Sequence, residues 1–410
     1  MLTKSAFDVE KVRKDFPILS TEMNGHPLAY LDNAATTQKP LSVINRITDF
    51  YKNEYATVSR GVYILSQNAT QECHQVRERC GQFLNVKDRH EIIFVRGTTE
   101  AINLVAASYG RKFLNSGDEI ILSTIEHHAN IVPWRRLADE KGLTIKVIPV
   151  TDEGELMMEE YKKLLTDKTK LVAVGHVSNA LGTVNPIKEI TRLAHEVGAK
   201  VLIDGAQGAP HAKVDVQDID CDFYCFSGHK IYGPTGVGVL YGKLELLEAM
   251  DPYQGGGEMI EMVTFDKVTY NKVPHKFEAG TIAIAEIVAL GPALDYIENL
   301  GLDQIAAYES ELLEEATRRL SEMDDIILIG TAKHKAAVLS FEMKDVHPHD
   351  IGTILDQHGV AVRTGHHCAQ PTMRRFNVPA TARASFAFYN NQRDVDMFVE
   401  ALDQVRKVFR

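Results

Sequence analysis

Two residues of this sequence, Lys230 and Asp204, have side chains and a spacing that would let them take part in the same covalent chemistry. Lys230 lies in SGHKIYGPTGVGVLYG, after an apolar run and before Gly233-Pro234, a pair that interrupts helix. A shielded amine with a lowered pKa is what Schiff-base chemistry requires. A lone lysine in a loop is more often a solvated charge, so this segment by itself leaves both interpretations open.

Asp204 ends the apolar run in VLIDGAQ. A carboxylate there needs a cationic or hydrogen-bonding partner, because burying it alone is costly. It could cap a helix, or it could face a protonated pyridine nitrogen and strengthen that ring as an electron sink. The separation of Asp204 and Lys230 suits one crossover between parallel strands, which would bring the two strand ends together.

Polar groups that could hold a phosphate and an aromatic ring follow other predicted strands. Thr98 and Thr99 lie in RGTTEAINL, where a strand turns into a helix whose free N–H groups favour an anion, although threonines there can be simple caps. Ser227 and His229, beside Lys230, could donate to the same phosphate. His127 in EHHAN could stack on a ring, because adjacent histidines lack the spacing of a helical zinc pair. A surface histidine pair is the alternative.

The five cysteines do not form a disulfide framework, since the set is odd and sparse. Four of them are expected to be core residues: Cys73, Cys80, Cys221 and Cys225. Cys368 differs, because it follows a probable strand in RTGHHCAQP with His366 and His367 beside it. Neighbouring imidazoles can favour the reactive thiolate. An ordinary loop thiol and a metal role for HHC are the alternatives.

The surrounding pattern predicts the elements that would position these groups. Short Val/Ile/Leu runs alternate with helical patterns up to about residue 290, which predicts a mostly parallel sheet covered on both faces. Ligands bind at the carboxyl ends of such strands. A long helical stretch is predicted over 293–323, and strands and helices of a smaller α+β domain follow it.

Length and charge narrow the possible functions. The chain has 410 residues, enough for two domains, and a formal charge of −11 from 45 basic and 56 acidic residues. That charge argues against nucleic acid or an anionic membrane as a partner. No apolar run approaches the roughly 20 residues of a membrane helix, and the N-terminus lacks a signal core, so we expect a cytoplasmic protein.

Motifs across nearly the whole chain resemble those of the group II cysteine desulfurases, specifically the SufS type. In order, they are DNAATTQKP, FVRGTTEAINLVA, IEHHANIVPW, HVSNALGTVNP, VLIDGAQ, FSGHKIYGPTGVGVLYG, GGGEMI, FEAGT, RTGHHCAQP and RASFAFYN. The resemblance implies a fold-type I aminotransferase-like α/β architecture, with a mostly parallel seven-stranded sheet and a smaller α+β C-terminal domain. The implied division is 1–25, packing with the small domain, 26–290, binding the cofactor, and 291–410, carrying Cys368.

The resemblance also assigns roles to individual residues. Lys230 would hold pyridoxal 5'-phosphate as a Schiff base, and Asp204, Gln207 and His127 would face its ring. Further cofactor contacts would come from Thr98, Thr99, Asn179, Ser227, His229 and, from the neighbouring subunit of a homodimer, Thr281. The substrate would be held by Asn179, Arg363, Arg383 and, across the dimer interface, Arg60. The family often has His before that arginine, whereas this chain has Ser59. No metal is implied.

The implied activity converts L-cysteine to L-alanine, with a persulfide on Cys368 that supplies sulfur for iron–sulfur cluster assembly. Lys230, His127 and Cys368 would be the catalytic residues. The acceptor would be of the SufU type, since His347 and His349 in DVHPHD resemble SufU-using proteins, with a SufE-type carrier as the alternative. A selenocysteine lyase would use nearly the same site. A kynureninase- or aminotransferase-like enzyme would share Lys230 and Asp204 and would not need Cys368. A binding or regulatory module could bind the cofactor through Lys230 and would turn over no amino acid.

Overall fold

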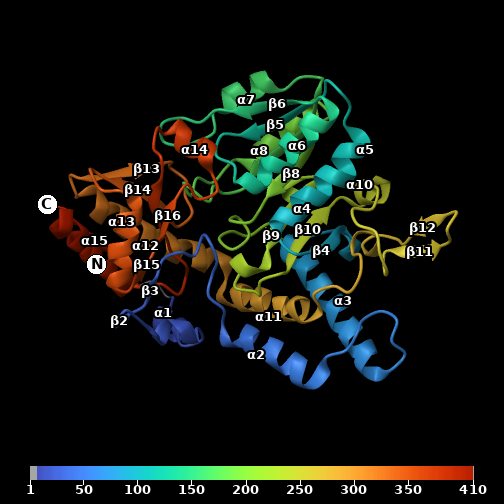
Figure 1. Ribbon diagram of the computed structural model, residues 1–410, viewed down its shortest axis with the longest axis horizontal. Helices are drawn as coiled ribbons and strands as arrows, with labels where there is room; N and C mark the ends of the chain where they lie inside the picture. Colours follow the sequence, from blue (N-terminus) through green and yellow to red (C-terminus); the bar gives the residue numbers. More distant parts are fainter. Residues whose placement is uncertain (1–6, 410) are drawn as a thin grey trace.

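The computed structural model describes residues 7–409, and its larger part is built on a seven-stranded sheet (Figure 1). In spatial order the strands are β4 (Ile92–Val95), β10 (Gly238–Gly242), β9 (Phe223–Ser227), β8 (Lys200–Asp204), β7 (Thr169–Gly175), β5 (Glu119–Ser123) and β6 (Thr144–Ile148). Only β10 runs antiparallel to its neighbours. The prediction of a mostly parallel seven-stranded sheet is confirmed.

The central strands are apolar throughout because both faces of the sheet are covered. Side chains alternate between the faces, so Val172 and Val174 of β7 join one core and Leu171 and Ala173 join the other. The first core includes residues of α3 (Ile64–Leu84), α8 (Ile187–Glu196) and α11 (Ile284–Leu300). The second includes residues of α4 (Thr98–Val105) and α6 (Val132–Lys141). The polar residues at the strand ends are therefore held on a rigid scaffold.

A second, antiparallel sheet has the order β13 (Ile326–Ile329), β14 (Val338–Met343), β17 (Thr381–Ser385) and β16 (Arg363–Gly365). The helices of this part are α12 (Leu302–Ser321), α13 (Pro348–Gln357) and α15 (Gln392–Phe409). The helical stretch predicted over 293–323 is present, and it is divided between two helices, α11 and α12. Gly301, with a φ of 85°, separates α11 from α12, because its left-handed conformation ends the first helix.

The segment before α2 (Leu41–Asp49) connects the second sheet to the seven-stranded sheet. Its strand β3 (Ala29–Tyr30) pairs with β15 (Val360–Ala361), and Asp32 then bridges to Ser385 at the end of β17. Upstream, Arg13 forms an ion pair with Asp394 of α15 at 2.9 Å. Residues 1–6 of the predicted N-terminal segment lie outside the described residues, and the division into domains stays a prediction, with residue 290 falling inside α11.

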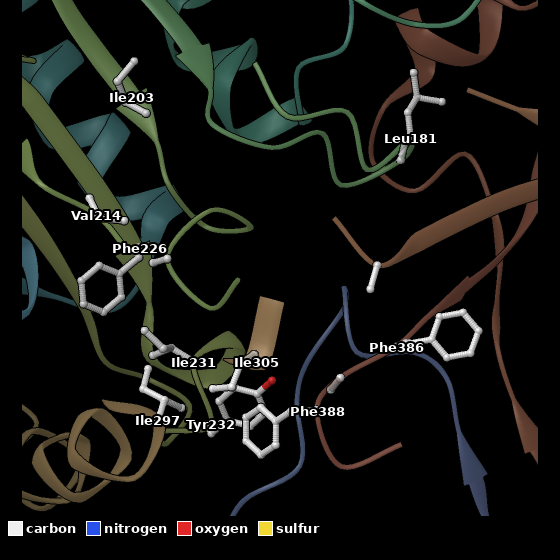
Figure 2. Packing of buried hydrophobic residues seen from close by; sticks show 14 of the residues in the cluster. Leu181, Ile203, Val214, Phe226, Ile231, Tyr232, Ile297, Ile305, Phe386 and Phe388 are labelled. Atoms are coloured by element: carbon white, nitrogen blue, oxygen red, sulfur yellow. The ribbon is translucent and has the colours of Figure 1, made fainter. Parts of the chain in front are cut away.

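Aromatic packing joins the loop after Lys230 to the second sheet. Tyr232 lies against Phe388, which follows β17, with ring centroids 4.4 Å apart, and Ile231 and Ile297 lie nearby (Figure 2). Tyr232 is fully buried and has a φ of 65°, an uncommon conformation for a bulky residue. This packing holds the lysine-bearing loop in place.

The remaining elements are short. They are α1 (Val9–Arg13), β1 (Glu22–Met23), β2 (His26–Pro27), α5 (Arg111–Phe113), α7 (Met158–Leu164), α9 (Val216–Ile219), α10 (Leu244–Ala249), β11 (Ile260–Val263), β12 (Val268–Tyr270) and α14 (Gln370–Arg375). The β11–β12 hairpin projects from the body of the molecule (Figure 1). Among residues 7–409, no helix has the length and apolar character needed to cross a membrane.

Candidate active site

A cavity of about 230 Å³ lies where β7, β8 and β9 end, at Gly175, Asp204 and Ser227. This is where the sequence predicted a ligand to bind. The cavity brings together most of the predicted site residues: Thr98, Thr99, His127, Asn179, Asp204, Gln207, Ser227, His229, Lys230, Arg363, Cys368 and Arg383. They come from segments far apart in the chain that meet at this edge of the sheet.

Asp204 ends β8 and Lys230 follows β9, the parallel strand beside it, as their spacing predicted. The Asp204 carboxylate accepts a hydrogen bond from the Ala206 N–H at 2.9 Å. Burial raises the pKa of Asp204, and the Lys230 charge opposes that effect. Burial also lowers the pKa of Lys230 to about 8, although Asp204 works against it. The result is an amine that can lose its proton near neutral pH, as Schiff-base chemistry requires.

The start of α4 also lines the cavity. Ser227 Oγ accepts from the Thr98 N–H at 2.9 Å and donates to Thr98 Oγ1 at 3.0 Å. A side chain on Gly238 of β10 would meet Gly97 Cα at 2.6 Å, so only glycine lets these two backbones approach. The first turn of α4 thus lines the cavity with Thr98 and Thr99, beside Ser227, and hydroxyl groups at a helix N-terminus are suited to an anion.

Two histidines of the cavity are held in the neutral form. Burial, followed by the Lys230 charge, lowers the pKa of both His127 and His229 to about 4. His127 Nδ1 accepts from the Ala129 N–H at 3.0 Å, which puts the ring proton on Nε2. The predicted ring residue Gln207 is oriented by its amide, which donates to the Ala34 carbonyl at 2.5 Å.

Two arginines share one carboxylate beside the cavity. Buried Arg383 donates to Asp32 Oδ1 at 3.0 Å and to the Asn179 carbonyl at 2.8 Å. Arg363 Nη1 lies 3.6 Å from Asp32 Oδ2. Burial lowers the pKa of Arg383, and Asp32 counters this effect. Two guanidinium groups lining one cavity are suited to binding a carboxylate.

Asp32, Glu126 and Lys39 were not singled out from the sequence. Asp32 and Lys39 lie within DNAATTQKP, and Glu126 is the first residue of EHHAN. Both motifs contribute to the family resemblance, but the sequence predicted no role for these three residues. Glu126 lines the cavity and accepts from Ser123 and Asn130, and burial raises its pKa to about 7. The Lys39 amine donates to the His229 carbonyl at 2.8 Å. For Asp32 and Glu126 the sequence signal was a carboxylate within three residues of the end of a strand, where burial makes charge costly. Lys39 carried no such signal.

Cys368 is the one cysteine of residues 7–409 that is not buried, and it lines the cavity. Burial raises the pKa of Cys73 and of Cys80 to about 12, and it raises the pKa of Cys221 and Cys225 as well. Thiols of that kind are inert at neutral pH, which leaves Cys368 as the accessible nucleophile. The expectation that the other four are core residues is confirmed.

Thr281 and Arg60 do not line this cavity. Thr281 borders a separate surface hollow together with Phe277 and Ile287. Exposed Arg60 forms an ion pair with Glu258 at 3.1 Å, and Ser59 before it has a φ of 72°. Within residues 7–409, no group of three or more His, Cys, Asp and Glu side chains is arranged to hold a metal.

The donors in the cavity fit pyridoxal phosphate. Asp204 is a buried carboxylate with a raised pKa, so a protonated ring nitrogen would stabilise its charge. The Lys230 amine makes no hydrogen bond or ion pair with any residue described, which leaves it available to an aldehyde carbon. The N-terminus of α4 would take the phosphate and neutral His127 would lie against the ring.

Comparisons with known proteins agree with this site. The family model described as aminotransferase class-V matches residues 29–398. A cysteine desulfurase of Dickeya dadantii is 52% identical over 98% of this chain and 98% of its own length. A cysteine desulfurase of Synechococcus elongatus is also 52% identical over 98% of this chain, and the match covers 64% of that longer protein. The crystal structure of the cysteine desulfurase CsdA from Escherichia coli superposes with a TM-score of 0.92 at 39% identity, covering 98% of this chain and 99% of that one. This chain therefore belongs to the class-V aminotransferases, and among them to the pyridoxal-phosphate-dependent cysteine desulfurases.

Proposed function

We propose that this protein converts L-cysteine to L-alanine and carries the sulfur as a persulfide on Cys368. One observation carries the proposal: the Lys230 amine and the Cys368 thiol line the same cavity, although they are far apart in the chain. An amine that forms a Schiff base and a thiol that accepts sulfur are the two groups that this reaction needs within reach of one substrate.

The cofactor would be held by the residues that line the cavity. Lys230 would bind it covalently, Asp204 would face the ring nitrogen, Gln207 the ring oxygen, and His127 the ring face. The phosphate would lie against Thr99, Ser227 and His229, close to Thr98. Bound pyridoxal phosphate supplies an electron sink that stabilises negative charge on the substrate's α-carbon.

The chain's own groups would then orient the substrate and move its protons. Arg383, Arg363 and Asn179 would hold the carboxylate of cysteine, which fixes the α-carbon near Lys230. The Lys230 amine would take the α-proton, and its pKa of about 8 suits a base that works near neutral pH. Neutral His127, with its proton on Nε2, would protonate groups that leave or return.

The sulfur step needs no outside oxidant or reductant. The Cys368 thiolate attacks the substrate sulfur, so a new S–S bond forms while the bond between that sulfur and the substrate β-carbon breaks. The electron pair of the broken bond stays with the carbon skeleton, which takes up protons and leaves as alanine. Cys368 is left as a persulfide, whose terminal sulfur can pass to an acceptor thiol.

We infer a homodimer in which each subunit completes the other's site. Thr281 and Arg60 lie outside this chain's own cavity, and the resemblance assigns both to the neighbouring one. Apolar side chains are exposed along 62–65, where Val62 is 92% exposed, and on the β11–β12 hairpin. A surface of that kind marks a protein contact.

We further assign the protein to the SufS type, with a cytoplasmic location and a role in iron–sulfur cluster assembly. His347 and His349 are exposed; His347 caps the start of α13, and His349 lies in its first turn. His347 Nδ1 accepts from the His349 N–H at 3.2 Å, so its Nε2 takes no part in that bond. Such a pair could meet the zinc of a SufU-type acceptor. Sulfide release with each acceptor present separates SufU from SufE, and relative turnover of cysteine and selenocysteine tests the selenocysteine lyase alternative.

The decisive experiment incubates the purified, cofactor-loaded enzyme with labelled cysteine and maps the label by mass spectrometry. We expect alanine in solution and one added sulfur on Cys368, and Cys368→Ala should lose alanine formation by roughly 100-fold or more. Full alanine production by Cys368→Ala, or sulfur on Cys73 or Cys221, would overturn the proposal. The first of these results would favour an enzyme that does not need the thiol.

A further inference from the structure

The loop that carries Cys368 has an unusual backbone. His367 and Cys368 have φ angles of 51° and 54°, so two successive residues with side chains adopt the left-handed conformation. Such a conformation is uncommon outside glycine and persists only where surrounding contacts hold it. The contacts of this loop therefore decide where the Cys368 sulfur lies.

Two segments from the seven-stranded part of the molecule hold the loop by its carbonyl groups. The Asn179 side-chain amide donates to the His367 carbonyl at 2.6 Å. The His128 backbone N–H donates to the Cys368 carbonyl at 2.7 Å. These bonds fix the peptide units on either side of the Cys368 α-carbon, and so they aim its side chain at the cavity.

His128 holds the loop a second time, through its ring. Its Nε2 accepts from the Gln370 N–H at 3.1 Å, and its ring centroid lies 5.5 Å from that of His366. Gln370 is the first residue of α14, and amides at the start of a helix need an acceptor from outside it. The imidazole of His128 is that acceptor, and because Nε2 accepts, the ring proton lies on Nδ1.

His128 bonds the Cys368 carbonyl on one side of Ala369 and the Gln370 amide on the other. One residue therefore holds the loop at two points. His127, the preceding residue, lines the cavity. His128 itself is absent from the cavity wall and is only partly exposed. The same dipeptide thus presents one ring to the cavity and uses the other to hold the thiol-bearing loop.

We propose that the His128 imidazole is a positioning residue that keeps the Cys368 sulfur in place for attack by bonding the Gln370 amide. This inference rests on the proposed function and deepens it. A nucleophile held near its target reacts faster than one that samples many positions. Losing the bond should therefore slow sulfur transfer to Cys368 and leave substrate binding unchanged, while the freed thiol becomes more accessible to reagents in solution.

The test compares variants of His128 whose side chains keep, shorten or remove the hydrogen-bond acceptor that Nε2 provides. His128→Phe keeps an aromatic ring against His366 and removes the acceptor. His128→Gln places an amide oxygen at about the reach of Nε2, whereas the shorter His128→Asn does not reach it. Gln370→Ala is the matched control, because Gln370 uses its backbone amide and its exposed side chain makes no hydrogen bond with any described residue.

Two rates are measured on the cofactor-loaded enzyme: alkylation of Cys368 by iodoacetamide, and persulfide formation in a single turnover. In His128→Phe we expect alkylation to rise and persulfide formation to fall, each by roughly fivefold, the population change expected from one lost hydrogen bond. The KM for cysteine should not change. His128→Asn should behave like His128→Phe, and His128→Gln and Gln370→Ala should match the wild type.

The inference fails if His128→Phe and His128→Asn alkylate at the wild-type rate, or if His128→Gln is no closer to wild type than they are. Should His128→Phe not fold, the comparison of Asn with Gln decides alone. Alkylation needs no turnover, so a wild-type enzyme that forms no persulfide would refute the proposed function while the loop measurement still stands.

Discussion

The Asp32 carboxylate lies 3.0 Å from the Arg383 guanidinium, and its other oxygen lies 3.6 Å from Arg363. Arg383 is 2% exposed, so its charge is stabilised by protein groups and hardly by water. Burial raises the pKa of Asp32, and the two arginines oppose that rise. Asp32 therefore orients both arginines that line the substrate cavity and keeps the buried charge of Arg383 in balance.

We expect Asp32→Asn to weaken substrate binding. An amide can still accept one hydrogen bond, but it carries no charge, so Arg383 loses a charge-assisted bond of about 1.5 to 3 kcal/mol. The KM for cysteine should rise roughly tenfold, the equivalent of about 1.4 kcal/mol. Steady-state kinetics measures this, and Asp32→Glu should recover part of the loss. An unchanged KM would show that the arginines are oriented without Asp32.

Lys230→Ala should abolish the visible absorbance of the Schiff base even when pyridoxal phosphate is added. Among residues 7–409, Lys230 is the one lysine that lines the cavity, so no other described amine is in place to replace it. The absorbance spectrum of the dialysed protein is the measurement. Lys243→Ala, at a lysine outside the cavity that pairs with Asp220 and Asp222, serves as the control and should remain yellow. A yellow Lys230→Ala protein would place the covalent link elsewhere.

A homodimer with shared sites predicts complementation. Lys230→Ala inactivates a subunit's own site, and Arg60→Ala should inactivate the site of its neighbour. In a mixed dimer, the site with an intact Lys230 would receive Arg60 from the other subunit. Random reassociation should restore roughly a quarter of wild-type alanine formation, since half of the dimers are mixed and each has one complete site. If the mixture is no more active than its components, each site is built from one chain.

Buried neutral histidines predict a loss of stability in acid. Burial lowers the pKa of His176 to about 4 and that of His367 to about 3, against about 6.5 in the unfolded chain. Between pH 6.5 and 4 the unfolded chain binds protons that the folded chain does not. The free energy of unfolding should therefore fall with falling pH, by up to about 1.4 kcal/mol per pH unit for each histidine.

Glu126 acts in the opposite sense. Burial raises its pKa to about 7, so the folded chain holds its proton at a pH where the unfolded chain has lost it. Urea unfolding of the cofactor-free protein at pH 7 and pH 5 measures the combined effect of the histidines and Glu126 on the free energy of unfolding. His176→Asn should flatten the dependence, because Asn cannot titrate and its amide, at about the reach of Nδ1, can still bond the Tyr224 hydroxyl, which lies 3.1 Å from His176 Nδ1. Parallel pH profiles for the two proteins would contradict this prediction.

The sequence predicted the buried strands well and the edge strand poorly. The strands β5, β7, β8 and β9 are apolar runs because both faces are covered, and such runs stand out in a sequence. At the sheet edge, β6 (TIKVI) is half exposed and was not singled out. Gly301 also went unrecognised as a helix boundary, because the apolar periodicity continues on both sides of it.

The sequence by itself determined the chemistry, because Lys230, Asp204 and Cys368 and the motifs around them can be recognised from the order of residues alone. Tertiary structure alone decided which other groups serve that chemistry. Asp32 meets Arg383, and His128 meets Gln370, across hundreds of residues, and no spacing in the chain encodes such contacts. A carboxylate or an imidazole acquires its role from burial and from its neighbours, and both exist only once the chain has folded.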